Sequence, residues 1–196
     1  MNTQIFTDLV GELGLPGMTL QTAFTEDDIG AILRIHLMTE KLVESWICAA
    51  CNQANFFGNG EDRIKIDYDA KIKIAKNLSF PPELYNALKT INKLRNDAAH
   101  LHNFKGIPNN KIDSLKDTLN GYRLDEYEVD KHTDEMPMRL YNGDGSIKGT
   151  YSMNSPETPN RLKLFLLFML FQTKLILTVS RIHLAQGANP DNNSSV

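Results

Sequence analysis

One short stretch of the chain carries side chains that could transfer a proton and hold a phosphate. Arg95 and Asn96 are followed, after three intervening residues, by His100. An imidazole titrates near neutral pH, a guanidinium binds phosphate oxygens through a fork of donors, and a carboxamide can orient either group. Together these groups could move a proton at a phosphate and stabilise the charge that develops on it. Arg95, Asn96 and His100 are therefore the candidate catalytic residues.

A predicted helix over residues 82–102 positions these side chains. Pro81 and Pro82 mark its start, because proline is tolerated in the first turn of a helix. Apolar residues at steps of three and four form its inner stripe: Leu84, Leu88, Ile91, Leu94, Ala98 and Leu101. The opposite arc is polar and basic, with Lys89, Asn92, Lys93, Asn96, His100 and Asn103. An anionic partner is expected on that arc.

Charge is distributed unevenly along the chain, although the formal net charge is only -3. Residues 89–116 hold six Lys or Arg and two Asp, whereas residues 124–135 hold six acids and one Lys. The low net charge excludes adhesion to nucleic acid or membrane driven by a positive field of the whole protein. A basic site must therefore be local, and the acidic segment is either a counter-charge or a solvated surface.

Hydrophobic periodicity and helix-boundary residues predict a mainly α fold, a bundle of five to six helices. The predicted helices cover residues 5–13, 26–54, 68–78, 82–102, 111–119 and 160–185. Between residues 122 and 159 the helical pattern fails, which predicts a long irregular insertion with a small β-hairpin around residues 142–145. Residues 1–186 are expected to form one domain, and residues 187–196 a disordered tail.

The last predicted helix contains the most apolar stretch of the chain. Its longest uninterrupted apolar run, Leu164 to Phe171, is far shorter than the ~20 residues that a bilayer span requires. We therefore expect a helix that is buried in the bundle or in a dimer interface. The N-terminus lacks the pattern of a secretory signal, so the expected location is the cytoplasm, with no membrane partner.

Two weaker patterns also contain side chains that could do chemistry. Cys48 and Cys51 form a single CxxC inside a helix, without the second pair that a zinc site requires, so no metal or cofactor is expected. His36, Glu40 and Glu44 recur at steps of four on the predicted helix 26–54. They form either a solvated helix face, which we favour, or a carboxylate placed against the catalytic residues.

The run Arg95-Asn96-Asp97-Ala98-Ala99-His100 resembles the R-N-x-x-x-H signature of the HEPN superfamily. Its members are small helical proteins and include metal-independent ribonucleases of toxin–antitoxin and antiviral defence systems. The order of a long helix, a short helix and the motif helix is also similar, over about residues 25–120.

This resemblance implies an endoribonuclease that cleaves RNA through attack by the 2′-hydroxyl group. His100 would transfer a proton, Arg95 would stabilise the phosphate charge, and Asn96 would orient a reacting group. The expected RNA-binding residues are Lys89, Lys93, Asn103 and Lys105.

The resemblance also implies a homodimer, because one chain offers one such histidine and two protomers would provide two Arg95/His100 sets. The apolar helix 160–185 is the expected dimer surface. An antitoxin or regulatory protein is a further expected partner. HEPN toxins that are silenced by tyrosine modification carry a Tyr two residues past the histidine, where this chain has His102.

The same span also resembles the mannitol-operon repressor family, an all-α group of regulators. The similarity lies in the layout of a long helix, the run KIKIAKNL and a proline-started helix with an Arg-Asn pair. Typical members do not keep the full Arg-to-His motif. This second resemblance implies a non-catalytic regulator or interaction module in which the same polar residues tie helices together.

Overall fold

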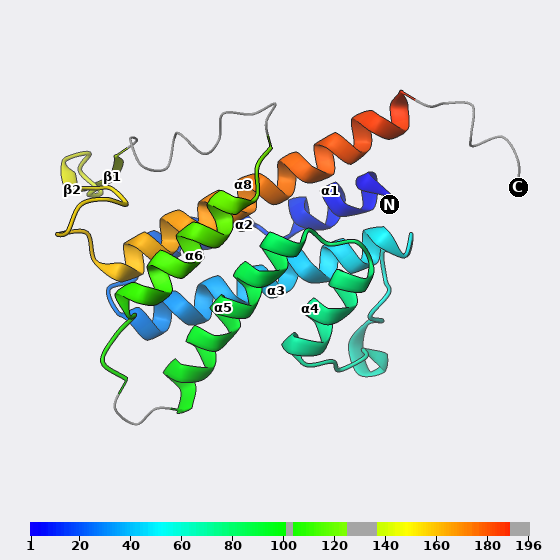
Figure 1. Ribbon diagram of the computed structural model, residues 1–196, viewed down its shortest axis with the longest axis horizontal. Coiled ribbons are helices and arrows are strands. Elements are labelled where there is room, and N and C mark those ends of the chain that lie inside the picture. Colours follow the sequence, from blue (N-terminus) through cyan, green and yellow to red (C-terminus); the bar gives the residue numbers. More distant parts are fainter. Residues whose placement is uncertain (101–103, 125–136, 189–196) are drawn as a thin grey trace, which may run out of the picture.

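The computed structural model describes residues 1–100, 104–124 and 137–188. Within these ranges it contains seven α-helices and one two-stranded antiparallel sheet (Figure 1). The helices are α1 (Thr3–Glu12), α2 (Leu15–Ala23), α3 (Asp28–Ala50), α4 (Tyr68–Asn77), α5 (Pro82–His100), α6 (Asn109–Gly121) and α8 (Asn160–Gly187). A short 3-10 helix, η1 (Gly60–Asp62), precedes α4, and the strands β1 (Met138–Tyr141) and β2 (Ile147–Tyr151) precede α8. The predicted mainly α fold with a small hairpin before the last helix is confirmed.

Helix α2 is the element that the sequence pattern misses. From the sequence, Gly14 and Pro16 indicate only the end of a helix. In the structure a second helix follows directly. Gly14 takes a left-handed conformation with φ of 59°, and α2 starts at Leu15 with Pro16 in its first turn. Gly14 is therefore the residue before α2, and Pro16 belongs to its first turn, where proline is favourable.

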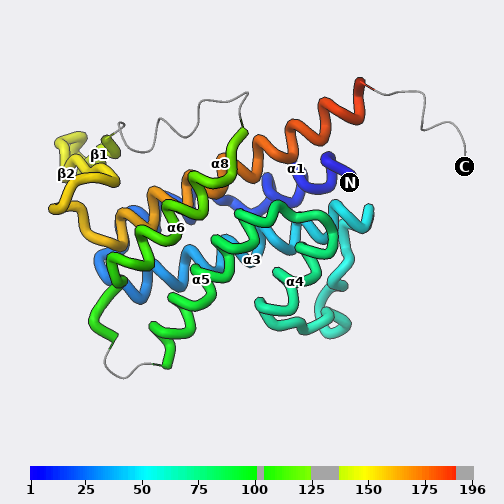
Figure 2. Tube along the Cα trace, in the orientation of Figure 1, coloured from blue at the N-terminus to red at the C-terminus, as the bar shows by residue number. Residues whose placement is uncertain are grey.

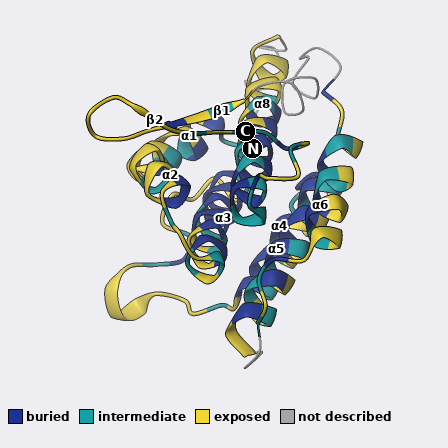
Figure 3. Ribbon diagram, turned by 90° about the vertical axis from the view of Figure 1, so that its left-hand side faces the viewer, coloured by how far each residue is buried: buried dark blue, intermediate teal, exposed yellow. Residues whose placement is uncertain are grey.

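Helix α3 is the centre of the bundle and contacts α1, α2, α4, α5 and α8. In Figure 2, α3, α5, α6 and α8 run side by side, with the hairpin at one end. The buried faces of the helices are turned toward one another, as the dark blue ribbons of Figure 3 show. The residues predicted for the inner stripe of α5 are buried: Leu84, Leu88, Ile91, Leu94 and Ala98. Leu101 lies outside the described residues.

Helix α8 packs as a core helix. It is the one helix in the described ranges that is long and apolar enough to cross a membrane, and 56% of its most apolar window is buried inside the protein. Lys174 is 1% exposed, and its Nζ donates to the carbonyl oxygens of Leu119 at 2.7 Å and Tyr122 at 2.6 Å. The lysine thereby caps the C-terminus of α6. Most of the apolar residues of α8 are thus buried within this chain, as expected for a helix inside the bundle, while Ile176 and Leu184 are 40% and 65% exposed.

The hairpin reaches the segment between α2 and α3. Its turn closes through Asn142, whose backbone N–H donates to the Ser146 carbonyl oxygen at 2.8 Å. Lys148 of β2 forms an ion pair with Glu26 at 3.3 Å and lies 5.5 Å from the centre of the Phe24 ring. Nearly all of the acidic segment 124–135 lies outside the described residues, as does the predicted tail beyond Ala188.

Candidate functional site

The candidate catalytic residues lie at the C-terminal end of α5. Asn96 and His100 are exposed, and Arg95 is half-buried at the edge of the polar arc. The Nη1 of Arg95 donates to the Asn96 Oδ1 at 3.1 Å. His100 ends the helix one turn further along and makes no hydrogen bond with a described residue. The structure therefore brings Arg95 and Asn96 into contact and leaves the His100 imidazole open to solvent.

The expected RNA-binding residues are divided between α5 and the loop that follows. Lys89 and Lys93 are exposed on the same arc of α5 as Asn96 and His100. Lys105 is exposed in the loop before α6. Asn103 lies outside the described residues. Within the described part of the chain, no group of three or more His, Cys, Asp or Glu residues is placed to hold a metal ion.

A second polar cluster joins α5 to α3. The Nε2 of His36 lies 3.4 Å from the Asn92 Oδ1, and its ring lies on the Tyr68 ring with 4.1 Å between centroids. Burial lowers the pKa of His36 below its usual 6.5, and the charges of Arg95 and Lys71 lower it further, against the Asn92 hydrogen bond and the charge of Glu40. The charge of Arg95 is one of the smaller contributions to this pKa shift, after burial, the Asn92 hydrogen bond and the charge of Glu40.

A buried ion cluster covers the second half of α3. The Nζ of Lys71, on α4, lies 2.6 Å from the Glu40 Oε1 and 2.7 Å from the Glu44 Oε1. Arg63 and Lys41 also reach Glu44, at 2.9 Å and 3.2 Å. Burial raises the pKa of Glu44, but the hydrogen bond and charge of Lys71 together with Lys41 outweigh it, so the net shift is downward. Two carboxylates therefore share three cations.

The favoured prediction of a solvated face at His36, Glu40 and Glu44 is wrong. His36 is half-buried against α5 and α4, and Glu44 is 9% exposed. The alternative, a carboxylate against the catalytic residues, does not describe Glu40 and Glu44 either, because both bind Lys71. Only His36 faces the motif helix, through Asn92. The sequence does not reveal the cations Lys71 and Arg63, since nothing in the spacing along α4 distinguishes Lys71 from its neighbouring lysines.

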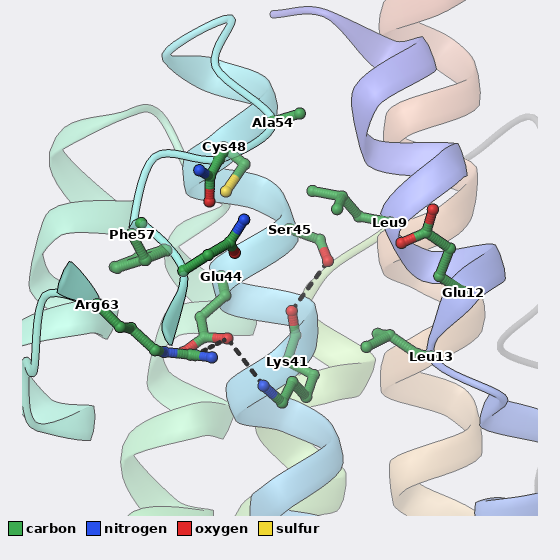
Figure 4. Close-up of a pocket in the computed structure, with 13 residues that line it drawn as sticks. Leu9, Glu12, Leu13, Lys41, Glu44, Ser45, Cys48, Ala54, Phe57 and Arg63 are labelled. Atoms are coloured by element: carbon green, nitrogen blue, oxygen red, sulfur yellow. Dashed lines mark hydrogen bonds and ion pairs between the residues drawn. The ribbon is translucent and has the colours of Figure 1, made fainter. Parts of the chain in front are cut away.

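A cavity of about 270 Å³ opens beside this ion cluster, between α1, α3 and the loop before η1. Figure 4 shows Lys41, Glu44 and Arg63 on one side of it and Leu9 and Leu13 of α1 on the other. Lys41 and Arg63 are both bound to Glu44, so neither cation is directed at a ligand. The cavity is also lined by Cys48, whose thiol pKa is raised by burial. A thiol in this state is a weak nucleophile.

The first half of α3 carries an uncovered apolar stripe. Ile29, Leu33 and Leu37, spaced by four, are 42%, 44% and 47% exposed. Arg34 contacts Gln21 of α2 on one side of the stripe, and His36 contacts Asn92 of α5 on the other. The apolar stripe therefore lies beside the helix that carries the candidate catalytic residues.

Comparisons of the chain with protein-family models, curated proteins and solved structures find no match. The likeness to the HEPN superfamily and to the mannitol-operon repressor family rests on the motif and on the order of helices.

Replacing Lys71 should destabilise the protein strongly. Lys71→Met leaves Glu40 and Glu44 without the cation that bridges them, and breaking a buried ion pair costs about 3–5 kcal/mol of the free energy of unfolding. Urea denaturation measures this loss. Lys73→Met is the matched control, because Lys73 lies on the same helix but is exposed in its pair with Asp69. Equal unfolding midpoints for the two variants would contradict the role given to Lys71.

The burial of His36 predicts a pH dependence of stability. Its pKa is lower in the folded chain than in the unfolded one, so the unfolded chain binds a proton first as the pH falls. The contribution of His36 to the free energy of unfolding is complete above about pH 6.5, and it is lost as the pH falls toward the pKa of His36 in the folded chain. The free energy of unfolding should therefore decrease from pH 7.5 to pH 5.5, and His36→Gln should flatten this decrease.

The ion cluster gives an internal comparison for that measurement. The pKa of Glu44 is lowered from 4.5, so its contribution is present above about pH 4.5 and is lost below it. Glu44→Gln should therefore leave the slope between pH 7.5 and pH 5.5 unchanged. A His36→Gln variant with the wild-type slope in that range would rule out His36 as its source.

Proposed function

We propose that the chain is a HEPN-like, metal-independent endoribonuclease that acts in the cytoplasm as the toxin of a toxin–antitoxin or antiviral defence system. The observation that carries this proposal is the exposure of Asn96 and His100 at the end of α5, with Arg95 hydrogen-bonded to Asn96 and not to a neighbouring helix. Residues that only joined helices would have their partners on another helix. In this chain Asn92 of α5 makes such a contact between helices, with His36 of α3.

The arrangement of these groups suits cleavage by the 2′-hydroxyl of RNA. His100 takes the hydroxyl proton as the oxygen attacks the adjacent phosphorus, and the bond to the 5′-oxygen breaks. The Arg95 guanidinium binds the phosphate oxygens, on which negative charge builds up, and Asn96 holds the guanidinium in place. The leaving 5′-oxygen takes up a proton, which gives a 2′,3′-cyclic phosphate and a 5′-hydroxyl.

A second proton-transfer group is supplied by a second copy of the chain. The apolar stripe Ile29, Leu33 and Leu37 is the surface that we assign to this contact, since it is exposed and lies beside α5. Pairing of two such stripes about a twofold axis would bury apolar area and bring the two copies of α5 toward a shared site. One His100 then acts as base and the other as acid.

The alternative function is a non-catalytic regulator or interaction module of the mannitol-operon repressor type. The contact between His36 and Asn92 favours this alternative, because it shows that one residue of the polar arc joins two helices. In that function the motif has no reaction to perform, and an antitoxin or other regulatory protein would not be needed to protect the host.

His100→Ala and Arg95→Ala should abolish RNA cleavage without unfolding the protein. Loss of a proton-transfer group lowers a rate by about 10²-fold or more, whereas an exposed substitution changes stability by less than about 0.5 kcal/mol. Cleavage of single-stranded RNA should proceed in EDTA and leave a cyclic phosphate. Lys65→Ala, at an exposed lysine before α4, is the control. A wild-type protein that leaves RNA intact and is harmless to a host without an antitoxin would support the regulator.

Leu33→Glu should separate the two copies. Sedimentation at micromolar concentration should show wild-type protein at twice the mass of the 22.1 kDa chain and the variant as a single chain. RNA cleavage should fall with dimer content, because the second His100 is lost. Ile64→Glu, at a residue that is 50% exposed outside the stripe, should stay dimeric. Wild-type protein that sediments only as a 22.1 kDa species would exclude the shared site.

A further inference from the structure

An aromatic side chain between two lysines lies at the beginning of the helix that carries the motif. Tyr85, in the first turns of α5, is half-buried, and the Nζ atoms of Lys76 and Lys89 lie 5.2 Å and 5.7 Å from the centre of its ring. Lys76 is on α4 and Lys89 is on α5. Two helices therefore place cations around one aromatic ring.

Tyr85 is in line with the candidate catalytic residues. Tyr85, Lys89, Lys93, Asn96 and His100 follow one another at steps of four and three, which places them on one face of α5. At 1.5 Å per residue, this face is about 22 Å long from Tyr85 to His100. At 3.4 Å per stacked nucleotide, it could contact about six nucleotides of a single strand.

The charge of this face is not neutralised by ion pairs within the described part of the chain. Lys76, Lys89 and Lys93 form no ion pair with a carboxylate of the described residues, unlike Lys73, which is paired with Asp69. Glu83, one of the two acids of α5, lies about 160° from Tyr85 around the helix, on the side away from the lysines. The other, Asp97, is four residues past Lys93 and borders the arc at about 40° from it, but the two form no ion pair. The face is therefore basic along its length and has one ring at its beginning.

We propose that this face is a binding track for single-stranded RNA, with one base stacked on Tyr85 and the phosphates bound by Lys76, Lys89 and Lys93. A stacking base would replace one ammonium group on the ring, and the long lysine side chain would then reach the neighbouring phosphate. Bases of a duplex are already stacked and paired, so the track selects unpaired strands. The inference rests on the proposed ribonuclease function and adds how the substrate is held and led to Arg95 and His100.

Binding can be measured apart from cleavage with a fluorescein-labelled, 2′-O-methylated single-stranded RNA, which lacks the attacking hydroxyl group. Fluorescence anisotropy should show Tyr85→Ala weakening binding by about tenfold, because one base loses its stacking partner. Tyr85→Phe should bind as wild type, since the ring is kept. The matched control is Tyr141→Ala, at a tyrosine of β1 that is 48% exposed. Thermal melting of each variant checks that it is folded.

The lysines are tested by the salt dependence of the same binding. Lys76→Ala and Lys89→Ala should each weaken binding and reduce the slope of log K against log salt by about 0.7, the value for one phosphate contact on a single strand. Lys65→Ala should leave the slope unchanged. A duplex of the same sequence should bind more weakly than the single strand, and polyglutamate should not compete.

The outcomes separate this inference from the proposed function. Equal affinity of folded Tyr85→Ala and wild type, or equal binding of single strand and duplex, would overturn the track. Full competition by polyglutamate would identify an acidic protein segment as the occupant and would overturn it too. If Tyr85-dependent RNA binding is found but unmodified RNA is not cleaved, the track stands and the ribonuclease assignment fails. If cleavage depends on His100 but binding does not depend on Tyr85, the ribonuclease assignment stands and the track fails.

Discussion

Where a helix is covered by its neighbours, a charged side chain on it needs a partner of opposite charge, and α3 is contacted by five other helices. Glu40 and Glu44 meet this requirement through Lys71, whose ammonium lies within 2.7 Å of both. The lysine positions α4, and Arg63 brings the preceding loop onto the same carboxylate. The arrangement covers the second half of α3 and leaves the outer side of its first half to Ile29, Leu33 and Leu37.

The position of α5 depends on the same central helix. Its inner stripe packs in the core, Asn92 contacts His36 of α3, and Asp28 at the start of α3 accepts a hydrogen bond at 2.9 Å from the backbone N–H of Ile107, beyond the end of α5. The inner stripe and Asn92 hold α5 against α3, and the Ile107 contact ties the segment before α6 to the start of α3. The polar end of the helix is therefore fixed in direction while Asn96 and His100 remain in solvent, which is what a rigid, accessible site requires.

The sequence predicts those features that repeat along one helix and misses those that depend on a distant partner. The inner stripe of α5 and the hairpin before α8 follow from periodicity and turn residues, and both are confirmed. Glu40 and Glu44 have the spacing of a solvated helix face. That spacing carries no information about Lys71, which lies 31 residues after Glu40 and 27 after Glu44. For the same reason the apolar residues of α8 predict burial but do not say whether the bundle or a second copy covers them; most of them are buried within this chain. The exposed residues Leu33 and Leu37 cannot be told from buried ones by their type. The proposed roles of Arg95, Asn96 and His100 remain predictions.

The ion cluster on the second half of α3 also sets a limit on what can lie along the first half. A helix that docks on Ile29, Leu33 and Leu37 runs into α4 and the Arg63 loop just beyond Leu37, so these elements act as a stop. About ten residues of α3, or roughly 15 Å, are left for contact. A partner helix consequently has one register available and a short contact length. In the proposed dimer, such a contact would give a well-defined alignment and a short lifetime, so that single and paired copies would interconvert.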